Sequence, residues 1–108
     1  MECLVERHCV PCHGGVPRLT GEEIAPLHAQ LRGWEVAEEH HLAKSYKFSN
    51  FADALEFVNR VGRVAEAEGH HPDIAFGWGY ADLTVYTHAI DGLSESDFIL
   101  AAKIDALE

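Results

Sequence analysis

The sequence predicts an α+β domain: a four-stranded antiparallel sheet with three helices on one face, in the order α-β-β-α-β-β-α. Three observations predict this class. Apolar residues recur at helical spacing in three segments, apolar and polar residues alternate between those segments, and a capping residue precedes each helical segment. The 108 residues fit one compact domain, because chains of this length rarely form two cores.

The first half of the chain predicts one helix and one pair of strands. Thr20 and Glu23 have the spacing of a capping box, so a helix should begin near Thr20 and end at Gly33. Pro26 lies beyond the first turn and predicts a late start or a kink, because proline removes an internal hydrogen bond. Residues 34–48 then alternate, which predicts two antiparallel strands joined by a turn.

The second half repeats this arrangement. Asn50 should cap the clearest helix, which carries apolar residues at i, i+3, i+4, i+7 and i+10 and should end near Gly69. Residues 74–80 alternate as in a strand, and a second strand should cover residues 81–88. Ser94 should cap a last helix.

The last helix predicts an interface between copies of the chain. Its apolar residues, which include Phe98, Ile99 and Leu100, cover more than one face and suggest burial on both sides. A domain this small also leaves much apolar surface exposed as a monomer. We therefore expect a homodimer or homotetramer formed through the C-terminal helix.

The charge of the chain argues against two classes of partner. Asp and Glu total 18 against 8 Lys and Arg, for a net charge of -10, so phosphate backbones and anionic membranes should repel the protein. No stretch approaches the roughly 20 apolar residues that span a bilayer, and the N-terminus lacks a signal pattern. We expect no direct binding to nucleic acid or membrane, and a cytoplasmic location.

The first nineteen residues predict an irregular N-terminal arm, and residues 20–108 form the predicted domain. The arm holds a CxxC motif, Cys9 to Cys12, followed by His13. This string is compatible with haem attachment or, together with His8, with a zinc knuckle. A CxxC without a second pair is a weak metal signal, so a loosely packed arm is the simpler interpretation.

Seven polar or ring-bearing residues form the pattern E-x3-H-H-P-x5-W-x9-H-x8-D; they are Glu66, His70, His71, Pro72, Trp78, His88 and Asp97. Two histidines at a helix-to-strand corner, stiffened by proline, can share one cleft with a third histidine at a strand end. Histidine can donate or accept a proton near neutral pH, which suits acid-base catalysis. A zinc site is the rival interpretation, although neighbouring histidines rarely reach the same ion.

Three members of the pattern have a structural alternative. Glu66 lies one turn before His70 and could accept its ring hydrogen, or it could form an exposed pair at the helix end. Asp97 could belong to the site or close a capping box with Ser94. Trp78 could stack on a ligand or pack against the sheet.

The complete pattern resembles that of the pterin-4a-carbinolamine dehydratases, over residues 20–108. The resemblance implies a lyase that converts 4a-hydroxytetrahydrobiopterin, or a related 4a-hydroxytetrahydropterin, to quinonoid dihydropterin and water during pterin recycling. It implies that His70 and His88 are the acid-base pair, in either order, and that His71 chiefly holds the pterin. Glu66, Pro72, Trp78 and Asp97 would support them.

The same resemblance implies that the reaction uses no cofactor, and the chain has neither a dinucleotide-binding glycine motif nor a phosphate-binding loop. It also leaves a different class of function open. Some members of the family serve as dimerisation cofactors of a homeodomain transcription factor, and related proteins serve as assembly factors. A protein-binding role is therefore the alternative to catalysis.

Overall fold

The computed structural model describes residues 4–9 and 17–107 and confirms the predicted order of helices and strands. The structure also contains two short 3-10 helices, η1 and η2, which the sequence did not predict. The elements are η1 (Leu4–Glu6), α1 (Gly21–His28), β1 (Glu35–Ala37), β2 (His41–Lys47), α2 (Phe51–Glu68), β3 (Asp73–Gly77), β4 (Tyr80–Val85), η2 (His88–Ile90) and α3 (Glu95–Asp105).

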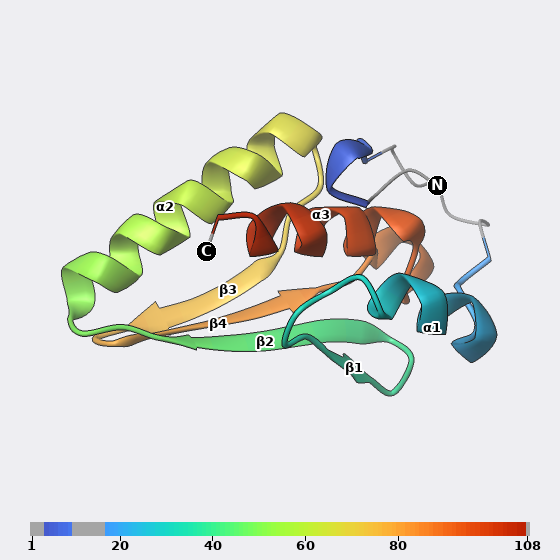
Figure 1. The fold of residues 1–108 in the computed structure, drawn as a ribbon, viewed down its shortest axis with the longest axis horizontal. Coiled ribbons are helices and arrows are strands. Elements are labelled where there is room, and N and C mark those ends of the chain that lie inside the picture. The colour runs from blue at the N-terminus through green and yellow to red at the C-terminus, as the bar shows by residue number, and fades with distance from the viewer. Residues whose placement is uncertain (1–3, 10–16, 108) are drawn as a thin grey trace.

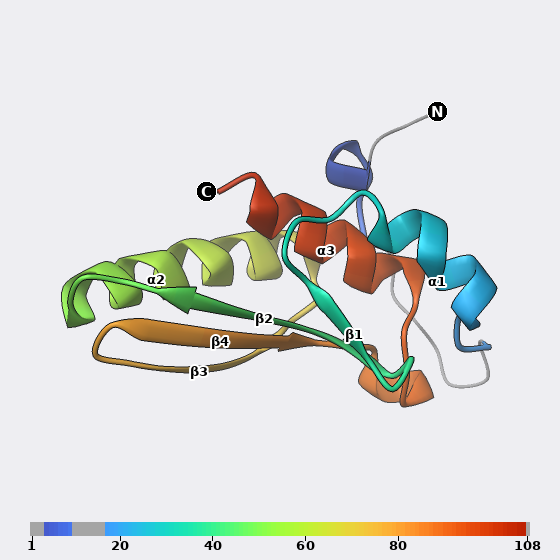
Figure 2. The ribbon, with the colours of Figure 1, turned by 60° about the horizontal axis from the view of Figure 1, so that its bottom comes forward.

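The four strands form one antiparallel sheet in the order β1-β2-β4-β3 (Figure 1). All three α-helices lie on one side of this sheet (Figure 2). The buried core is therefore built from the inward-facing residues of the strands, such as Leu42, Leu83 and Val85, and from the helices that cover them. The predicted fold class is confirmed.

The three predicted helix caps are present. Thr20 and Glu23 form a capping box at α1, and the side chain of Asn50 accepts a hydrogen bond from the backbone N–H of Asp53 at α2. Helix α1 begins directly at Gly21, so the late start expected from the proline is wrong. The helix is also shorter than predicted, because it ends at His28, two residues after the proline and well before Gly33.

The predicted strand over residues 74–80 is interrupted by a turn. β3 ends at Gly77 and β4 begins at Tyr80, so Trp78 and Gly79 form a two-residue connection. Gly79 has a φ of +82°, a left-handed conformation that glycine adopts without strain. Aromatic residues alternate on both sides of the turn, so the sequence pattern did not indicate that the chain reverses there.

The second predicted strand is shorter than expected at its C-terminal end. β4 ends at Val85, and His88 begins η2 instead of ending the strand. The backbone N–H of Thr87 donates to the carbonyl of Gly92 at 2.9 Å, and this bond closes a tight turn around η2. Closure of the turn diverts the chain out of the sheet before His88.

Helix α3 is enclosed by its own chain. Nine of its residues are buried, and its neighbours include η1, α1 and α2. Its wide apolar arc is therefore explained by packing within one chain, and an interface between copies through this helix stays a prediction. Whether the protein forms oligomers through another surface stays a prediction.

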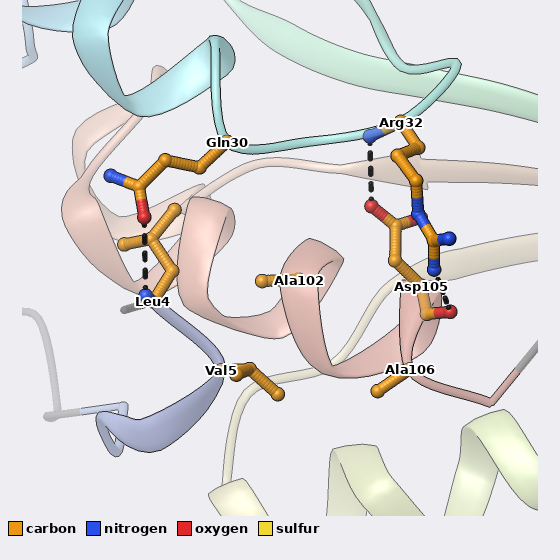
Figure 3. Close-up of a pocket in the computed structure, with 7 residues that line it drawn as sticks. All are labelled: Leu4, Val5, Gln30, Arg32, Ala102, Asp105 and Ala106. Atoms are coloured by element: carbon orange, nitrogen blue, oxygen red, sulfur yellow. Dashed lines mark hydrogen bonds between the residues drawn. The ribbon is translucent and has the colours of Figure 1, made fainter. Parts of the chain in front are cut away.

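The described part of the N-terminal arm is packed, not loose. Leu4 is 1% exposed and belongs to the main core, and its backbone N–H donates to Oε1 of Gln30 (Figure 3). Nζ of Lys103 donates to the carbonyl of Val5 at 2.8 Å. Residues 4–6 of the arm thus form a 3-10 helix packed against the domain, whereas Cys12 and His13 lie outside the described residues.

Candidate active site

His70 lies at the corner between α2 and β3. Gly69 ends α2 in the left-handed conformation, with a φ of +66°, and turns the chain away from the helix axis. This turn directs His70 toward the start of α3, where its Nε2 lies 2.5 Å from Oδ1 of Asp97. The imidazole is 14% exposed and the carboxylate is completely buried. The corner therefore holds one histidine against a buried carboxylate, in a nearly enclosed hydrogen-bonded pair.

Asp97 is fixed by three further hydrogen bonds. Its Oδ2 accepts from the hydroxyl of Thr87 and from the backbone N–H of Ser94, both at 2.8 Å, and Ser94 Oγ lies 3.4 Å away. Asp97 thus closes the capping box of α3 and contacts His70 at the same time. The capping-box interpretation of this residue is confirmed, and its other carboxylate oxygen remains free to contact His70.

The contact with Asp97 determines how the His70 ring can work. A carboxylate without a proton can only accept hydrogen bonds, so Nε2 of His70 must carry the shared hydrogen. Nδ1 is then the ring nitrogen left to take up or release a proton. A buried carboxylate behind an imidazole is a recurring arrangement in which the carboxylate fixes the tautomer and the orientation of the ring.

Glu66 pairs with His71, not with His70 as predicted. Both members of this pair are exposed, with 58% of the histidine side chain and 78% of the glutamate side chain accessible. The helical i,i+4 spacing assumed for Glu66 and His70 fails because α2 ends before His70. His71 is consequently the exposed member of the two neighbouring histidines.

His88 is brought to the same corner through two connections. Its ring Nε2 lies 3.8 Å from Oδ2 of Asp73, which follows Pro72 at the start of β3. Its neighbour Thr87 donates to Asp97, the partner of His70. The three histidines, the proline and Asp97 therefore lie around one end of the β3–β4 pair, and their use of one common cleft stays a prediction.

Trp78 is not part of this corner. It lies in the turn at the other end of β3, and five strand residues place it roughly 17 Å from the start of that strand. The side chain is 71% exposed, so it neither packs in the core nor stacks near the histidines of the same chain. Both roles considered for Trp78 are therefore unsupported within one chain.

The residues of this corner all lie within the segment of the chain that a family model matches. The family model for pterin 4 alpha carbinolamine dehydratase matches residues 17–107. The chain belongs to this family. A protein of Rubrobacter xylanophilus, provisionally named a pterin-4-alpha-carbinolamine dehydratase, is 63% identical over 99% of this chain and 100% of its own length. A protein of the same provisional name from Alkaliphilus metalliredigens is 49% identical over 97% and 96%.

Two solved structures of pterin dehydratase type share the fold. One is a transcriptional coactivator/pterin dehydratase from Brucella melitensis, with a TM-score of 0.77 and 32% identity over 84% of this chain and 98% of that one. The other is a pterin dehydratase-like protein described as a RuBisCO assembly factor in the alpha-carboxysome, with a TM-score of 0.60 and 28% identity over 70% and 89%. The names of the similar proteins thus include dehydratases, a transcriptional coactivator and an assembly factor.

Sequence reasoning missed several residues that support the histidine corner or the segments packed beside it. Thr87 holds Asp97, Asp73 approaches His88, and Glu68 anchors the N-terminal arm by accepting from the backbone N–H of Cys9 at 2.8 Å. The sequence could have indicated Thr87 because it precedes His88, and Asp73 because it follows Pro72. Glu68 gave no signal, because its partners come from the distant arm.

Cys9 is the one cysteine of the CxxC motif that lies within the described residues. Cys9 Sγ donates to the carbonyl of Ser96, and burial, followed by the charge of Glu68, raises the pKa of the Cys9 thiol to about 12. A thiol in this state is protonated at neutral pH, whereas metal binding and disulfide exchange need the thiolate. Within residues 4–9 and 17–107, no group of three His, Cys, Asp or Glu side chains could hold a metal ion.

A separate hollow of about 370 Å³ lies at the opposite end of α3, between the N-terminal segment and the loop after α1 (Figure 3). Apolar side chains line most of it, and Arg32 donates from its backbone N–H and its guanidinium to Asp105. Asp105 also accepts from Nε1 of Trp34 at 2.9 Å. This buried carboxylate ties α3 to the first hairpin and has no histidine partner in the described structure.

The described residues contain no helix that is both long and apolar enough to cross a bilayer. The cytoplasmic location stays a prediction.

Proposed function

We propose that this chain is a 4a-hydroxytetrahydropterin dehydratase, which eliminates water from a pterin carbinolamine by histidine acid-base catalysis. The observation that carries the proposal is the His70–Asp97 pair, nearly enclosed and placed next to His71 and His88 within the matched family region. Paired titratable groups of this kind concentrate at functional sites.

The reaction requires one proton to be delivered and one to be removed. The bond between C4a and its hydroxyl breaks, and the oxygen leaves with the electron pair and takes a proton to become water. N5 loses its hydrogen, and the electron pair of that bond forms the double bond between N5 and C4a. No oxidant, reductant or further reactant is needed.

Two histidines with different surroundings can divide these proton transfers. Asp97 holds His70 so that Nδ1 is available, and His88 is 62% exposed and can exchange protons with water between turnovers. In either order, one imidazolium protonates the leaving hydroxyl while the other, neutral imidazole accepts the N5 proton. His71, exposed and paired with Glu66, is suited to hold the pterin ring through hydrogen bonds.

The direct test is the decay of enzymatically generated 4a-carbinolamine, followed by stopped-flow absorbance. The proposal predicts that catalytic amounts of the protein accelerate the decay and that the acceleration saturates with substrate. A decay rate unchanged by added protein contradicts the proposal. His28→Gln, which alters a histidine at the end of α1, provides a matched control that should retain wild-type turnover.

A second candidate function is binding to another protein, because the two structural neighbours include a coactivator and an assembly factor. The feature of this chain that favours it is an exposed apolar surface on α2 and the β3–β4 turn. Phe51, Leu55 and Trp78 are 45%, 39% and 71% exposed there. Solvent-exposed apolar clusters commonly mark protein interfaces.

The two functions separate experimentally, because the apolar surface and the histidine corner lie at different ends of β3. Affinity capture from native lysate, with Trp78→Ser as the matched control, would support binding if a partner is lost with the substitution. Recovery of only self-copies would count against a heterologous partner.

A further inference from the structure

Three aromatic rings outside the family pattern lie in a row that ends at His88. The ring centroids of Tyr86 and His88 are 4.1 Å apart with the planes inclined by 26°, which is a stacked arrangement. Tyr86 also contacts His40, at 4.7 Å, and His40 contacts His41 edge-on at 5.4 Å. His40 ends the turn between β1 and β2, His41 begins β2, and this turn lies against η2 (Figure 2).

The orientation of the His88 ring needs an explanation that the polar contacts do not provide. Its ring Nε2 is 3.8 Å from Asp73, beyond hydrogen-bond distance, and 62% of its side chain is exposed. It stands at the start of a 3-10 helix of only three residues. The stacked ring of Tyr86 is an ordered surface that can fix the plane of this imidazole.

Tyr86 is itself tied back to the segment that holds His88. Nε2 of His40 lies 2.7 Å from Oδ1 of Asp91, and this hydrogen bond, reinforced by the histidine's charge, lowers the pKa of Asp91. The backbone N–H of Asp91 donates to the carbonyl of His88 at 3.2 Å and closes η2 in a left-handed conformation. The contacts therefore run in a closed circuit from His88 through Tyr86, His40 and Asp91 back to His88.

We propose that Tyr86 is a positioning residue for His88, and that His40 and Asp91 hold Tyr86 and η2 in register. The inference rests on the proposed dehydratase function, because it gives the orientation of His88 a purpose. In this arrangement, hydrogen bonds position His70 and ring stacking positions His88. Loss of the Tyr86 ring should lower kcat more than it changes KM, since the imidazole would remain present but poorly oriented.

The experiment compares Tyr86→Leu, Tyr86→Phe and the control Tyr80→Leu, which removes an exposed tyrosine from the same strand. Proton–carbon NMR of the histidine rings should show the His88 ring protons shifted upfield by the stacked ring in wild-type protein. Tyr86→Leu should abolish the shift and lower kcat roughly tenfold, with KM within about twofold. Tyr86→Phe should restore both the shift and most of kcat, and Tyr80→Leu should behave as wild type.

A second variant guards against misfolding of Tyr86→Leu. His40→Ala leaves the strand intact and removes the support of Tyr86, so it should reduce the His88 ring shift and lower kcat by a smaller factor. If the wild-type protein accelerates carbinolamine decay, but Tyr86→Leu and His40→Ala keep the wild-type kcat and the wild-type His88 ring shift, the inference about Tyr86 is wrong. The proposed dehydratase function would stand in that case. A wild-type protein that does not accelerate carbinolamine decay would contradict the proposed function and remove the catalytic purpose of the stack, whatever the ring shifts show.

Discussion

The two sides of the histidine corner are held by different means. His70 is 14% exposed and bonded to a buried carboxylate that has backbone and hydroxyl partners of its own. His88 is 62% exposed, lies on a three-residue helix and rests against the ring of Tyr86. The difference shows that one imidazole is fixed by the core of the fold, whereas the other is fixed by its neighbours on the surface.

The largest expected effect comes from removing either histidine. His70→Ala and His88→Ala should each lower kcat for carbinolamine dehydration about 100-fold or more, the usual scale of general acid-base catalysis. Stopped-flow kinetics would measure this effect against the His28→Gln control. Near-normal turnover in either variant would contradict the assignment of that histidine to the acid-base pair.

Asp97→Asn tests whether the buried carboxylate fixes His70. The amide cannot accept from all the donors that face the carboxylate, so a buried hydrogen bond is lost or mismatched. We expect the free energy of unfolding to fall by about 1–3 kcal/mol in urea titrations and kcat to fall with it. Asp73→Asn, which changes an exposed carboxylate near His88, should cost about 0.5 kcal/mol or less. Equal losses of unfolding free energy in Asp97→Asn and Asp73→Asn would contradict the proposed difference between the buried and the exposed carboxylate.

His71→Ala should have a smaller effect and a different kinetic signature. His71 is exposed and paired only with exposed Glu66 among its described contacts, so its removal should weaken binding without disturbing the acid-base pair. We expect KM to rise several-fold, up to roughly tenfold, with kcat within about threefold of wild type. A fall in kcat as large as that of His70→Ala would make His71 a proton-transfer residue.

The smallest effect concerns the N-terminal arm. Burial raises the pKa of Glu68, but hydrogen bonds from Cys9 and His8 and the charge of Lys103 outweigh it and hold this pKa below its ordinary value of 4.5. A lowered carboxyl pKa stabilises the fold above pH 4.5, and this contribution disappears as the pH falls through the pKa of the folded state.

Glu68→Gln should therefore lose less stability than wild type when urea unfolding at pH 7 is compared with unfolding at pH 3. Glu66→Gln provides the control, because Glu66 is an exposed glutamate on the same helix. Identical acid sensitivity in Glu68→Gln and wild type would contradict the anchoring role of Glu68.

The sequence predicted those features that depend on local spacing. The capping boxes, the periodicity of α2 and the place of three histidines around one corner all follow from residues close together in the chain. The features that it missed depend on distant contacts or on a single backbone reversal. The turn at Gly69 broke the expected pairing of Glu66 with His70, and packing against η1, α1 and α2 explained the apolar arc of α3.

The central claim is that His70 and His88 face one bound pterin. It is tested most directly by an experimental structure of the protein with a dihydropterin that lacks the 4a-hydroxyl group. The account predicts that Nδ1 of His70 and the His88 ring lie within hydrogen-bond reach of the C4a–N5 edge, on opposite sides of the reacting bond. A pterin bound away from this corner, for example in the hollow beside Leu4 and Arg32, would contradict it.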